Sequence, residues 1–190
     1  MKIVLATNNK HKLEEINEIS KNCGIEFVLP PEGFDPIETG TTFAENSYIK
    51  AAEAAKLANC LALADDSGLC VTALNGAPGI LSARYAETPE KRIEKLISAL
   101  TPYKDKTAKF VCCMTLVSPN GEIVKQTNGE CCGKITESRK GTNGFGYDPI
   151  FIPNDYNCTL AELSDTSKNA ISHRGHALRE MLEFLKTLNF

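Results

Sequence analysis

Apolar and polar residues alternate along this chain with two distinct periods, and each period predicts one kind of element. Short apolar runs bounded by turn residues predict β-strands. The turn-forming stretch Pro119-Asn120-Gly121 predicts a hairpin between two of these runs. We expect strands at Lys2–Thr7, Ile25–Leu29, Leu61–Ala64 and Leu69–Ala73, a hairpin from Lys109–Ser118 and Glu122–Gly133, and a short edge strand at Pro149–Ile152.

Apolar residues at helical spacing predict four helices between these strands. The second begins with the capping box Thr42-Phe43-Ala44-Glu45, and the third with Thr88 and Pro89 as N-cap and N1. The first places apolar residues inward and Glu14, Glu15 and Glu18 outward, and the last carries the stripe Leu178, Met181, Leu182 and Leu185. We expect helices at Lys10–Asn22, from Thr42 to about Asn59, from Thr88 to near Leu100, and from about His173 to Leu188.

Strands that alternate with helices and then form a hairpin predict an α/β fold with a mixed sheet. The chain has 190 residues, which suits one domain with a sizeable core. It shows no internal repeat and no linker composition. We therefore expect residues 1–190 to form a single domain.

The charge balance argues against polyanionic partners. A formal net charge of -3 gives no general attraction to nucleic acid or to anionic membranes, so we expect neither as a partner. No apolar run is long enough to span a bilayer, and the first strand pattern turns polar at Thr7, unlike a signal peptide. These features predict a cytoplasmic protein.

Eight cysteines invite a disulfide framework, but the length of the chain and the lack of a secretion signal favour reduced thiols. No CxxC spacing occurs. The vicinal pairs Cys112-Cys113 and Cys131-Cys132 fall in predicted strands, where neighbouring side chains point to opposite faces. We expect buried thiols that act as small hydrophobic residues rather than a shared metal site.

The most unusual stretch is Ala64-Asp65-Asp66-Ser67-Gly68-Leu69, which places two adjacent carboxylates between two apolar runs. We interpret it as two buried strands joined by a tight acidic corner. Adjacent acids repel each other, and a fold tolerates them best beside a cation such as Mg²⁺. The alternative is an ordinary solvated turn, since Asp, Ser and Gly are common turn residues.

Three further polar segments carry candidate chemistry. Thr7-Asn8-Asn9-Lys10-His11-Lys12 lies where a strand passes into a helix, a place that favours an anion, although the motif alone is more typical of an N-cap with solvated lysines. Residues 140–149 combine glycines with Phe145 and Tyr147, whose rings could stack on a base or pack inward. In residues 168–175, His173 and Arg174 occupy the first turn of a helix, where cations oppose the dipole unless an anionic or oxygen-rich group binds; the alternative is a pair of exposed polar residues.

Together these segments resemble the Ham1/inosine triphosphate pyrophosphatase family, in its bacterial dITP/XTP pyrophosphatase form. The matching motifs occur in order along nearly the whole chain: TNNKHK, ETGTTFAENS, ADDSGL, GAPGILSARYA, GFGYDPIF and KNAISHRG. The resemblance implies an elongated mixed sheet flanked by helices, two lobes with a nucleotide cleft between them, and commonly a homodimer. It also implies Mg²⁺-dependent hydrolysis of dITP, ITP and XTP to the monophosphate and pyrophosphate.

The resemblance also implies roles for individual residues. Asp66 is the expected general base and metal ligand, with Asp65 beside it. The position three residues before Gly40, where many members place a metal-binding Glu, is Ile37, so either Glu38 substitutes for it or the metal relies more on Asp66. The expected substrate-binding residues are Thr7, Asn8, Asn9, Lys10, His11 and Lys12 for the triphosphate, Ser67 beside the base, and Phe145, Gly146, Tyr147, Asp148, Lys168, His173 and Arg174 on the purine side.

Three other classes of function remain open at this point. A Maf-like nucleotide pyrophosphatase would share the broad architecture but act on other nucleotides. A catalytically silent nucleotide-binding protein would use the same residues without turnover. A structural interaction module would explain the helices but not the glycines, carboxylates and cations gathered in four separate loops.

Overall fold

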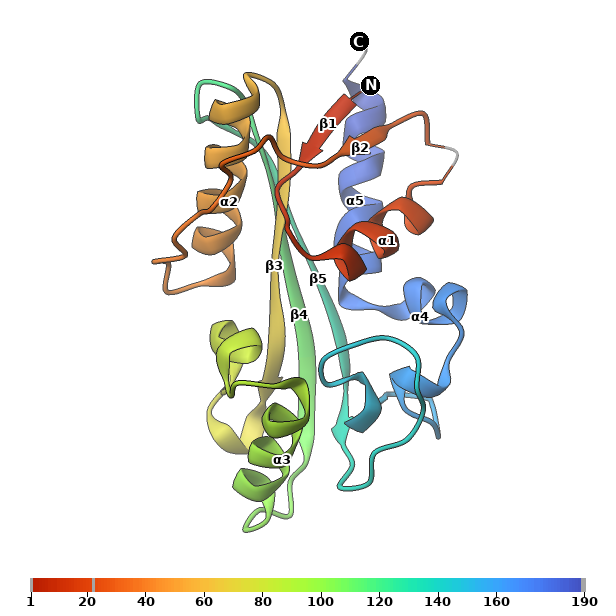
Figure 1. The fold of residues 1–190 in the computed structure, drawn as a ribbon. Coiled ribbons are helices and arrows are strands. Elements are labelled where there is room, and N and C mark those ends of the chain that lie inside the picture. Colours follow the sequence, from red (N-terminus) through yellow and green to blue (C-terminus); the bar gives the residue numbers. More distant parts are fainter. Residues whose placement is uncertain (1, 22, 189–190) are drawn as a thin grey trace. The chain divides into compact units, whose positions relative to one another are not determined.

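The computed structural model describes residues 2–21 and 23–188, and Figure 1 shows its elements in chain order. The strands are β1 (Lys2–Leu5), β2 (Glu26–Val28), β3 (Ala62–Val71), β4 (Thr107–Val117), β5 (Ile123–Ile135) and β6 (Phe151–Pro153). The α-helices are α1 (Lys10–Ile19), α2 (Phe43–Ala58), α3 (Pro89–Leu100), α4 (Asp165–Ile171) and α5 (His173–Thr187). Short 3₁₀ turns lie at Thr72–Leu74, Gly79–Arg84, Asp148–Ile150 and Leu160–Glu162.

Within the described residues the strands form one six-stranded sheet in the order β2-β1-β3-β4-β5-β6. β1 pairs in parallel with β2 and β3, whereas β5 and β6 are antiparallel. The sheet is therefore mixed, as the sequence predicts. The elongated shape, the two lobes and the nucleotide cleft implied by the family resemblance stay predictions.

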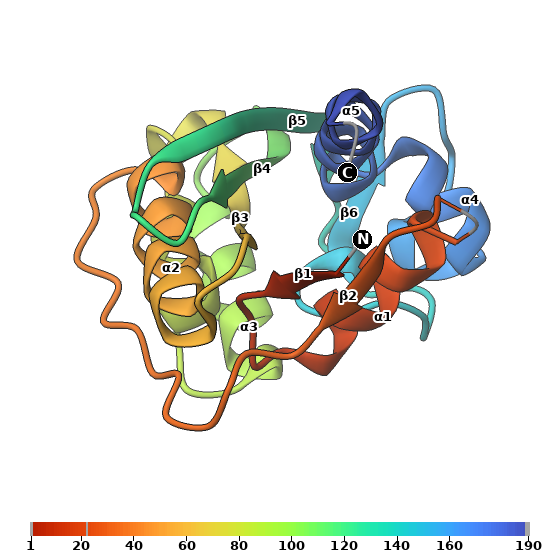
Figure 2. The same cartoon turned by 90° about the horizontal axis from the view of Figure 1, so that it is seen from above.

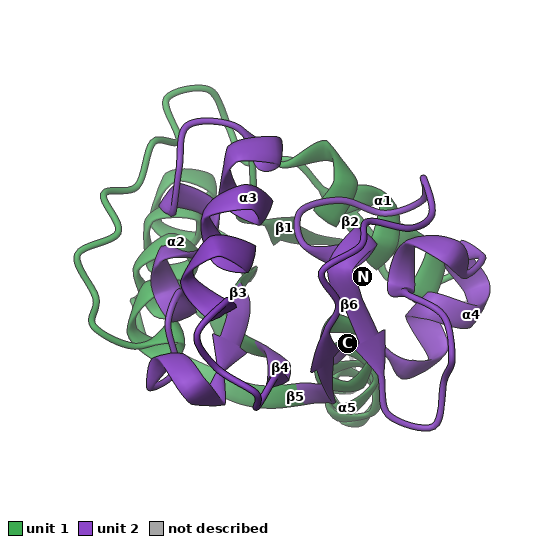
Figure 3. Ribbon diagram, turned by 90° about the horizontal axis from the view of Figure 1, so that it is seen from below, with its two compact units in different colours: residues 1–66, 112–129, 174–190 green, residues 67–111, 130–173 purple. Residues whose placement is uncertain are grey.

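The chain divides into two compact units, coloured separately in Figure 3. Unit 1 consists of residues 1–66, 112–129 and 174–190, and unit 2 of residues 67–111 and 130–173. Both units are discontinuous in sequence. The predicted single domain over residues 1–190 is not tested by this division and stays a prediction.

Unit 1 buries its part of the sheet on both faces. Ile3 and Leu5 of β1 belong to a core with α1 and α5, while Val4 of β1 and Ala6 just after it belong to a core with α2. This split follows from strand geometry, in which successive side chains point to opposite faces. Figures 1 and 2 show the same arrangement, with α2 on one side of β1 and β3 and with α1 and α5 on the other.

Unit 2 has its own core. Ile93, Leu96 and Leu100 of α3 are buried together with Leu69 and Val71 of β3. Their spacing of three and four residues places them on one face of the helix. Phe151 of β6 and Tyr147 of the preceding loop belong to the same core.

Most predicted elements are confirmed, with ends shifted by a few residues. Thr42 and Thr88 cap α2 and α3 through their side chains, and Pro119-Asn120-Gly121 turns the chain between β4 and β5. Helix α1 ends at Ile19, and the predicted end at Asn22 lies outside the described residues. The stripe of α5 is buried as expected: Leu178, Met181, Leu182 and Leu185.

One prediction about elements is wrong, and one helix was not predicted. The acidic corner does not exist, because β3 continues without interruption through Asp65, Asp66, Ser67 and Gly68. The solvated-turn alternative also fails, since Asp65 is 2% and Asp66 8% exposed. In addition, α4 was not predicted at all, and Ser172 follows α4 as its C-cap.

All eight cysteines are free thiols, as the sequence predicts. Cys112, Cys113 and Cys131 are buried, and burial raises the pKa of the Cys131 thiol to about 11. The expectation of burial is wrong for Cys132, which is exposed. Among the described residues, no helix is both long enough and apolar enough to cross a membrane.

Candidate active site

The predicted phosphate loop joins β1 to α1 in unit 1. Asn9 caps α1 by accepting hydrogen bonds from the backbone N–H groups of His11 and Lys12. The Thr7 hydroxyl accepts the Asn9 N–H at 3.0 Å, and the Asn8 amide donates to the Phe34 carbonyl at 3.4 Å. These bonds fix the loop at a helix N-terminus, where the dipole favours an anion. Lys10 and His11 are exposed.

Asp65 lies at the centre of a balanced cluster of charges in unit 1. Its Oδ1 is 3.0 Å from the Lys12 ammonium, and its Oδ2 accepts hydrogen bonds from Nε and NH2 of Arg174 at 3.2 and 3.1 Å. Arg174 also pairs with Glu15 of α1. The cluster thus holds two carboxylates and two cations. Glu15 therefore points inward, which corrects the prediction that it occupies the outer face of α1.

The environment of Asp65 strongly favours its ionised form. Burial alone would raise the pKa of this carboxyl, but Lys12, Arg174 and Lys50 outweigh burial and hold the pKa far below 3.8. Burial lowers the pKa of Lys12 below its ordinary value of 10.5, although Asp65 acts in the opposite sense. Lys12, the predicted phosphate-binding lysine, is therefore paired with the buried carboxylate of Asp65.

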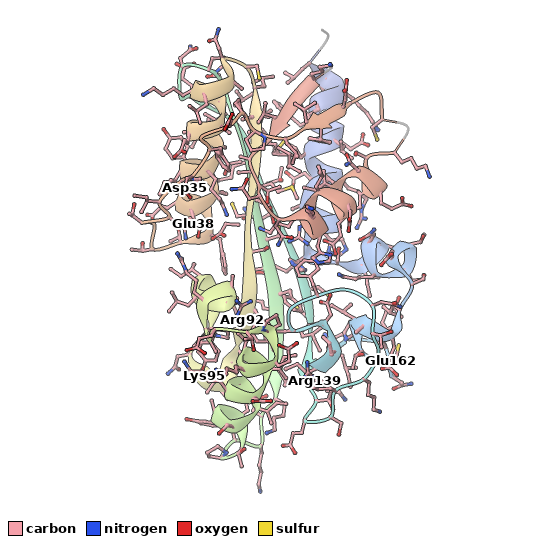
Figure 4. All side chains as sticks on the ribbon, in the orientation of Figure 1. Asp35, Glu38, Arg92, Lys95, Arg139 and Glu162 are labelled. Carbon is pink, nitrogen blue, oxygen red and sulfur yellow. The ribbon has the colours of Figure 1, made fainter. Side chains whose placement is uncertain are left out.

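Asp66 has entirely different partners. Its Oδ1 is 3.0 Å from the Lys50 ammonium of α2, which is also 2.9 Å from Oε1 of Glu38. Glu38 lies in the segment that leads into α2, and Figure 4 labels it beside the first turns of that helix. The two carboxylates and the single ammonium carry a combined charge of -1 when all three are ionised. Burial raises the pKa of Asp66, and Lys50 offsets part of that effect.

Strand alternation explains why two adjacent acids serve separate clusters. Leu63 belongs to the core shared with α1 and α5, whereas Ala62 and Ala64 belong to the core shared with α2. Continuing this period of two directs Asp65 toward α1 and α5, and Asp66 toward α2. The two carboxylates therefore avoid the mutual repulsion that a shared corner would impose.

A network of hydrogen bonds fixes the segment that carries Glu38. The Gly40 N–H donates to Oδ1 of Asn46 at 2.9 Å, and the Thr41 N–H donates to Glu45 at 2.6 Å. The Glu45 N–H in turn donates to the Thr42 hydroxyl at 3.1 Å. Thr42 is confirmed as the N-cap, whereas the Glu45 carboxylate accepts its hydrogen bonds from the N–H and hydroxyl groups of Thr41. Ile37, by contrast, is 79% exposed.

The Asp66 cluster has the chemistry that a divalent cation requires. Mg²⁺ prefers hard oxygen ligands and is commonly bound by one or two carboxylates together with substrate phosphates. Glu38 and Asp66 supply two such carboxylates, which converge on one ammonium. Oδ2 of Asp66 is buried and has no hydrogen-bond partner within the part of the chain that the structure describes. The residues present therefore fit such a metal.

The predicted base-side residues of unit 2 form a second group. Oδ2 of Asp148 accepts the Phe145 N–H at 2.9 Å and is 2.8 Å from the Lys168 ammonium. That ammonium lies 4.8 Å from the centre of the Phe145 ring, in a cation–π arrangement. A Cβ on Gly144, whose φ is +72°, would lie 2.2 Å from Asp148 Oδ2, so this loop requires glycine there.

The remaining predicted site residues are more enclosed than the sequence suggests. Tyr147 is 4% exposed and donates to the Ser82 carbonyl at 3.0 Å, so its ring packs inward in this structure. The His173 ring stacks on Phe110 with centroids 4.8 Å apart. Ser67 and Gly146 are half-buried. The stacking role predicted for Phe145 and Tyr147 is therefore open only to Phe145 without rearrangement.

Sequence reasoning missed Lys50 and misplaced Glu15. The buried face of α2 consists of Asn46, Ser47, Lys50, Ala51, Ala54 and Ala55. A lysine at helical spacing among small residues is a detectable signal, because lysine is rarely buried without a partner. For Glu15 the available signal is its position three residues after Lys12, on the same face of α1.

The sequence profile of the Ham1 family matches residues 3–184 of this chain. The chain belongs to the Ham1 family. This membership confirms the resemblance identified from the six motifs.

Individual relatives agree with this assignment to the Ham1 family over nearly the whole chain. A protein named dITP/XTP pyrophosphatase from Desulforamulus reducens is 47% identical over 196 residues, covering 99% of this chain and 97% of the relative. A protein of the same name from Synechocystis is 42% identical over 188 residues, with the same two coverages. A solved HAM1 protein from Coxiella burnetii has a TM-score of 0.90 and 42% identity, covering 98% of this chain and 99% of that chain.

Proposed function

We propose that this Ham1-family protein hydrolyses non-canonical purine nucleoside triphosphates (dITP, ITP and XTP) to the monophosphate and pyrophosphate. The proposal rests first on relatives named dITP/XTP pyrophosphatase that match nearly the full chain at 42% to 47% identity. The Asp66 cluster supports the proposal further. Its two carboxylates, from Glu38 and Asp66, carry a net negative charge together with the ammonium of Lys50 and could hold a metal.

In this proposal the triphosphate binds at the N-terminus of α1. Thr7, Asn8, Asn9, Lys10, His11 and Lys12 form the phosphate-binding segment. The α1 dipole and the Lys12 ammonium stabilise the charge that grows on the phosphates during the reaction. The ion pair with Asp65 holds Lys12 in place for this task.

Asp66 and Glu38 would hold the metal, which we propose to be Mg²⁺. When bound, Mg²⁺ neutralises phosphate charge and favours departure of pyrophosphate. Asp66 orients a water molecule for in-line attack on the α-phosphorus and accepts its proton.

The base is selected by hydrogen-bond donors that suit a 6-oxo group. We assign this selection to the purine-side residues, including Lys168, His173 and Arg174, with Phe145, Gly146, Tyr147, Asp148 and Ser67 as further contacts. An adenine presents its 6-amino group to the same donors, and a buried donor without a partner costs about 1–3 kcal/mol. Several such losses together reach the roughly 10⁴-fold discrimination of sites that read hydrogen bonds.

Two finer statements belong to the same proposal. We propose that the protein is a homodimer, as is common in the family. We also propose that it acts in the cytoplasm, where it would remove these nucleotides from the pool of precursors for nucleic acid synthesis.

The decisive experiment measures turnover of dITP and XTP against dATP, dGTP, dTTP and UTP, with and without Mg²⁺. Products are separated so that pyrophosphate is distinguished from phosphate. We expect Mg²⁺-dependent release of pyrophosphate from dITP and XTP, and little turnover of the other four. Release of single phosphates would overturn the mechanism, and a preference for dTTP or UTP would favour a Maf-like enzyme. Binding of dITP without turnover would identify a silent nucleotide-binding protein.

A further inference from the structure

The ammonium of Lys50 contacts the same two carboxylates that are assigned to the metal. Nζ lies 2.9 Å from Oε1 of Glu38 and 3.0 Å from Oδ1 of Asp66. The side chain of Lys50 is 10% exposed and that of Asp66 is 11% exposed. The pair with Asp66 is therefore nearly enclosed, whereas Glu38, whose side chain is 25% exposed, is partly open to solvent.

The charge of Lys50 is well secured in this position. Its ammonium lies within 3.0 Å of one oxygen on each of two carboxylates, which stabilise its protonated form. Its stem emerges from the buried face of α2, between Asn46 and Ala54 at the preceding and following turns. The ammonium is thus a fixed internal cation at neutral pH.

An ammonium and a divalent cation cannot both bind these oxygens closely. Mg²⁺ requires its ligands at about 2.0–2.1 Å. A second positive charge within about 4 Å would be repelled by several kcal/mol at the effective dielectric constant of a protein surface. A metal that uses Oε1 of Glu38 and Oδ1 of Asp66 must therefore displace Lys50 from them, and a metal on the unpartnered Oδ2 of Asp66 would still be repelled by the nearby ammonium. A lysine has a flexible four-carbon stem, and triphosphate oxygens offer its ammonium another set of acceptors.

We propose that Lys50 is an internal counter-cation that competes with the divalent metal for Glu38 and Asp66. The nucleotide-free protein then binds the metal weakly, and the metal binds tightly only together with the triphosphate, which attracts the ammonium away. This inference rests on the proposed function. It explains why the metal and the triphosphate bind together. Lys50 is then the residue that couples the binding of one to the binding of the other.

The test measures Mn²⁺ binding to the full-length protein without nucleotide, by electron paramagnetic resonance of free Mn²⁺. We expect Lys50→Gln to bind Mn²⁺ at least about tenfold more tightly than the wild type, because the competing charge is gone while both carboxylates remain. Lys50→Arg keeps the charge and should bind as weakly as the wild type. Equal affinity of Lys50→Gln and the wild type would overturn the inference.

Two matched controls separate competition from a general charge effect. Lys56→Gln removes an exposed lysine from the same helix and should leave the affinity unchanged. Lys12→Gln removes a lysine whose partner is Asp65 rather than Asp66, so its effect should be clearly smaller than that of Lys50→Gln. An equal gain in Lys12→Gln would show that local net charge, not competition, governs metal binding, and would overturn the inference.

Removal of Lys50 leaves two carboxylates without their cation, so folding must be followed separately. Lys50→Met retains the apolar stem, and its melting temperature should rise on addition of Mn²⁺ while that of the wild type stays unchanged. A rise of the same size in the wild type would contradict competition.

These measurements need no nucleotide turnover. A wild type that hydrolyses dITP while Lys50→Gln gains no Mn²⁺ affinity refutes only this inference, whereas absence of dITP hydrolysis refutes only the proposed function.

Discussion

At the scale of single residues, Asp65 and Asp66 show how one peptide bond separates two chemical roles. Asp65 is tied to Lys12 and Arg174, and these cations lower its pKa. Asp66 shares one ammonium with Glu38, and burial raises its pKa. The fold therefore favours the charged form of one carboxyl and disfavours that of its neighbour. Replacement by Asn should therefore lower stability at Asp65 and lower catalytic activity at Asp66.

We predict that Asp65→Asn destabilises the protein and that Asp66→Asn chiefly inactivates it. A group with a lowered pKa contributes stability above its unfolded pKa, and Asp65→Asn also leaves buried cations unpaired, at a cost of about 3–5 kcal/mol. Asp66→Asn should change stability by about 1 kcal/mol or less. It should lower kcat on the order of 10²–10⁴-fold by removing the proposed base. Urea unfolding checks the stability of both variants, and dITP turnover checks their activity. Near-normal turnover of Asp66→Asn would refute the role of Asp66 as general base.

The position of Arg174 leads to a related prediction. Its side chain is 2% exposed, and its guanidinium is already paired with Asp65 and Glu15, whatever it contributes to base selection. Arg174→Ala should therefore reduce stability by about 3–5 kcal/mol, because it leaves buried carboxylates without their cation. Glu15→Gln, which keeps the shape of one partner, should cost less. If Arg174→Ala unfolds at the wild-type urea concentration, these ion pairs contribute nothing to stability.

Lys12 should set the alkaline limit of activity. Burial lowers its pKa below 10.5, so the phosphate-binding ammonium loses its proton at a lower pH than an ordinary lysine. We expect kcat/KM to fall as the pH rises through this lowered pKa. Lys12→Arg should shift the alkaline limb upward, because arginine stays protonated. Lys10→Arg, at an exposed position of the same loop, should leave the limb in place, and an unshifted limb in Lys12→Arg would contradict the assignment.

At the scale of elements, the sequence predicted α2, α3, α5 and the β4–β5 hairpin because their signals are local. Caps such as Thr42 and Thr88, the turn at Pro119-Asn120-Gly121 and the stripe of α5 all depend on neighbours within a few residues. Helix α4 escaped prediction because its seven residues carry too little periodicity to stand out.

For strand β3, by contrast, the local signal is strong but points to a turn. Asp65, Asp66, Ser67 and Gly68 all favour turns locally, yet they continue a strand. The partners that make this tolerable are distant in sequence, since Lys50 precedes Asp66 by 16 residues and Arg174 follows Asp65 by 109. No local pattern reveals these ion pairs, so the residues of the candidate site were predicted better than their grouping.

The segment before α2 offers a prediction at this scale. A Cβ on Gly40 would lie 2.6 Å from Oδ1 of Asn46 and 2.7 Å from Cβ of Glu45. Gly40→Ala should therefore break the bond to Asn46, displace Glu38 and raise the Mg²⁺ concentration needed for half-maximal activity several-fold. Gly33→Ala is the control, because a Cβ there has no neighbour within 4 Å, although its φ of +89° adds backbone strain. Unchanged Mg²⁺ dependence in Gly40→Ala would show that this bond does not position Glu38.

At the scale of the whole molecule, the chain passes repeatedly between its two units. Unit 1 needs three separate segments of sequence and unit 2 needs two. Strands β3, β4 and β5 each contain residues of both units, because β3 crosses the boundary after Asp66, β4 after Val111 and β5 after Gly129. Neither unit is a continuous piece of chain that could be excised. The single domain predicted from the sequence stays a prediction, which an unfolding experiment can test.

We therefore predict that the two units unfold together. Leu96→Ala removes a fully buried side chain from α3 in unit 2 and should cost about 2–5 kcal/mol. Because unfolding of either unit disrupts strands that continue into the other, hydrogen exchange of the β1 amides in unit 1 should lose protection by the same free energy. The exposed Leu57→Ala serves as the control and should leave exchange nearly unchanged. Calorimetric and van't Hoff enthalpies should agree in both variants, as for a two-state transition. Undiminished protection of β1 in Leu96→Ala would instead show two units of independent stability, and the single-domain prediction would fail.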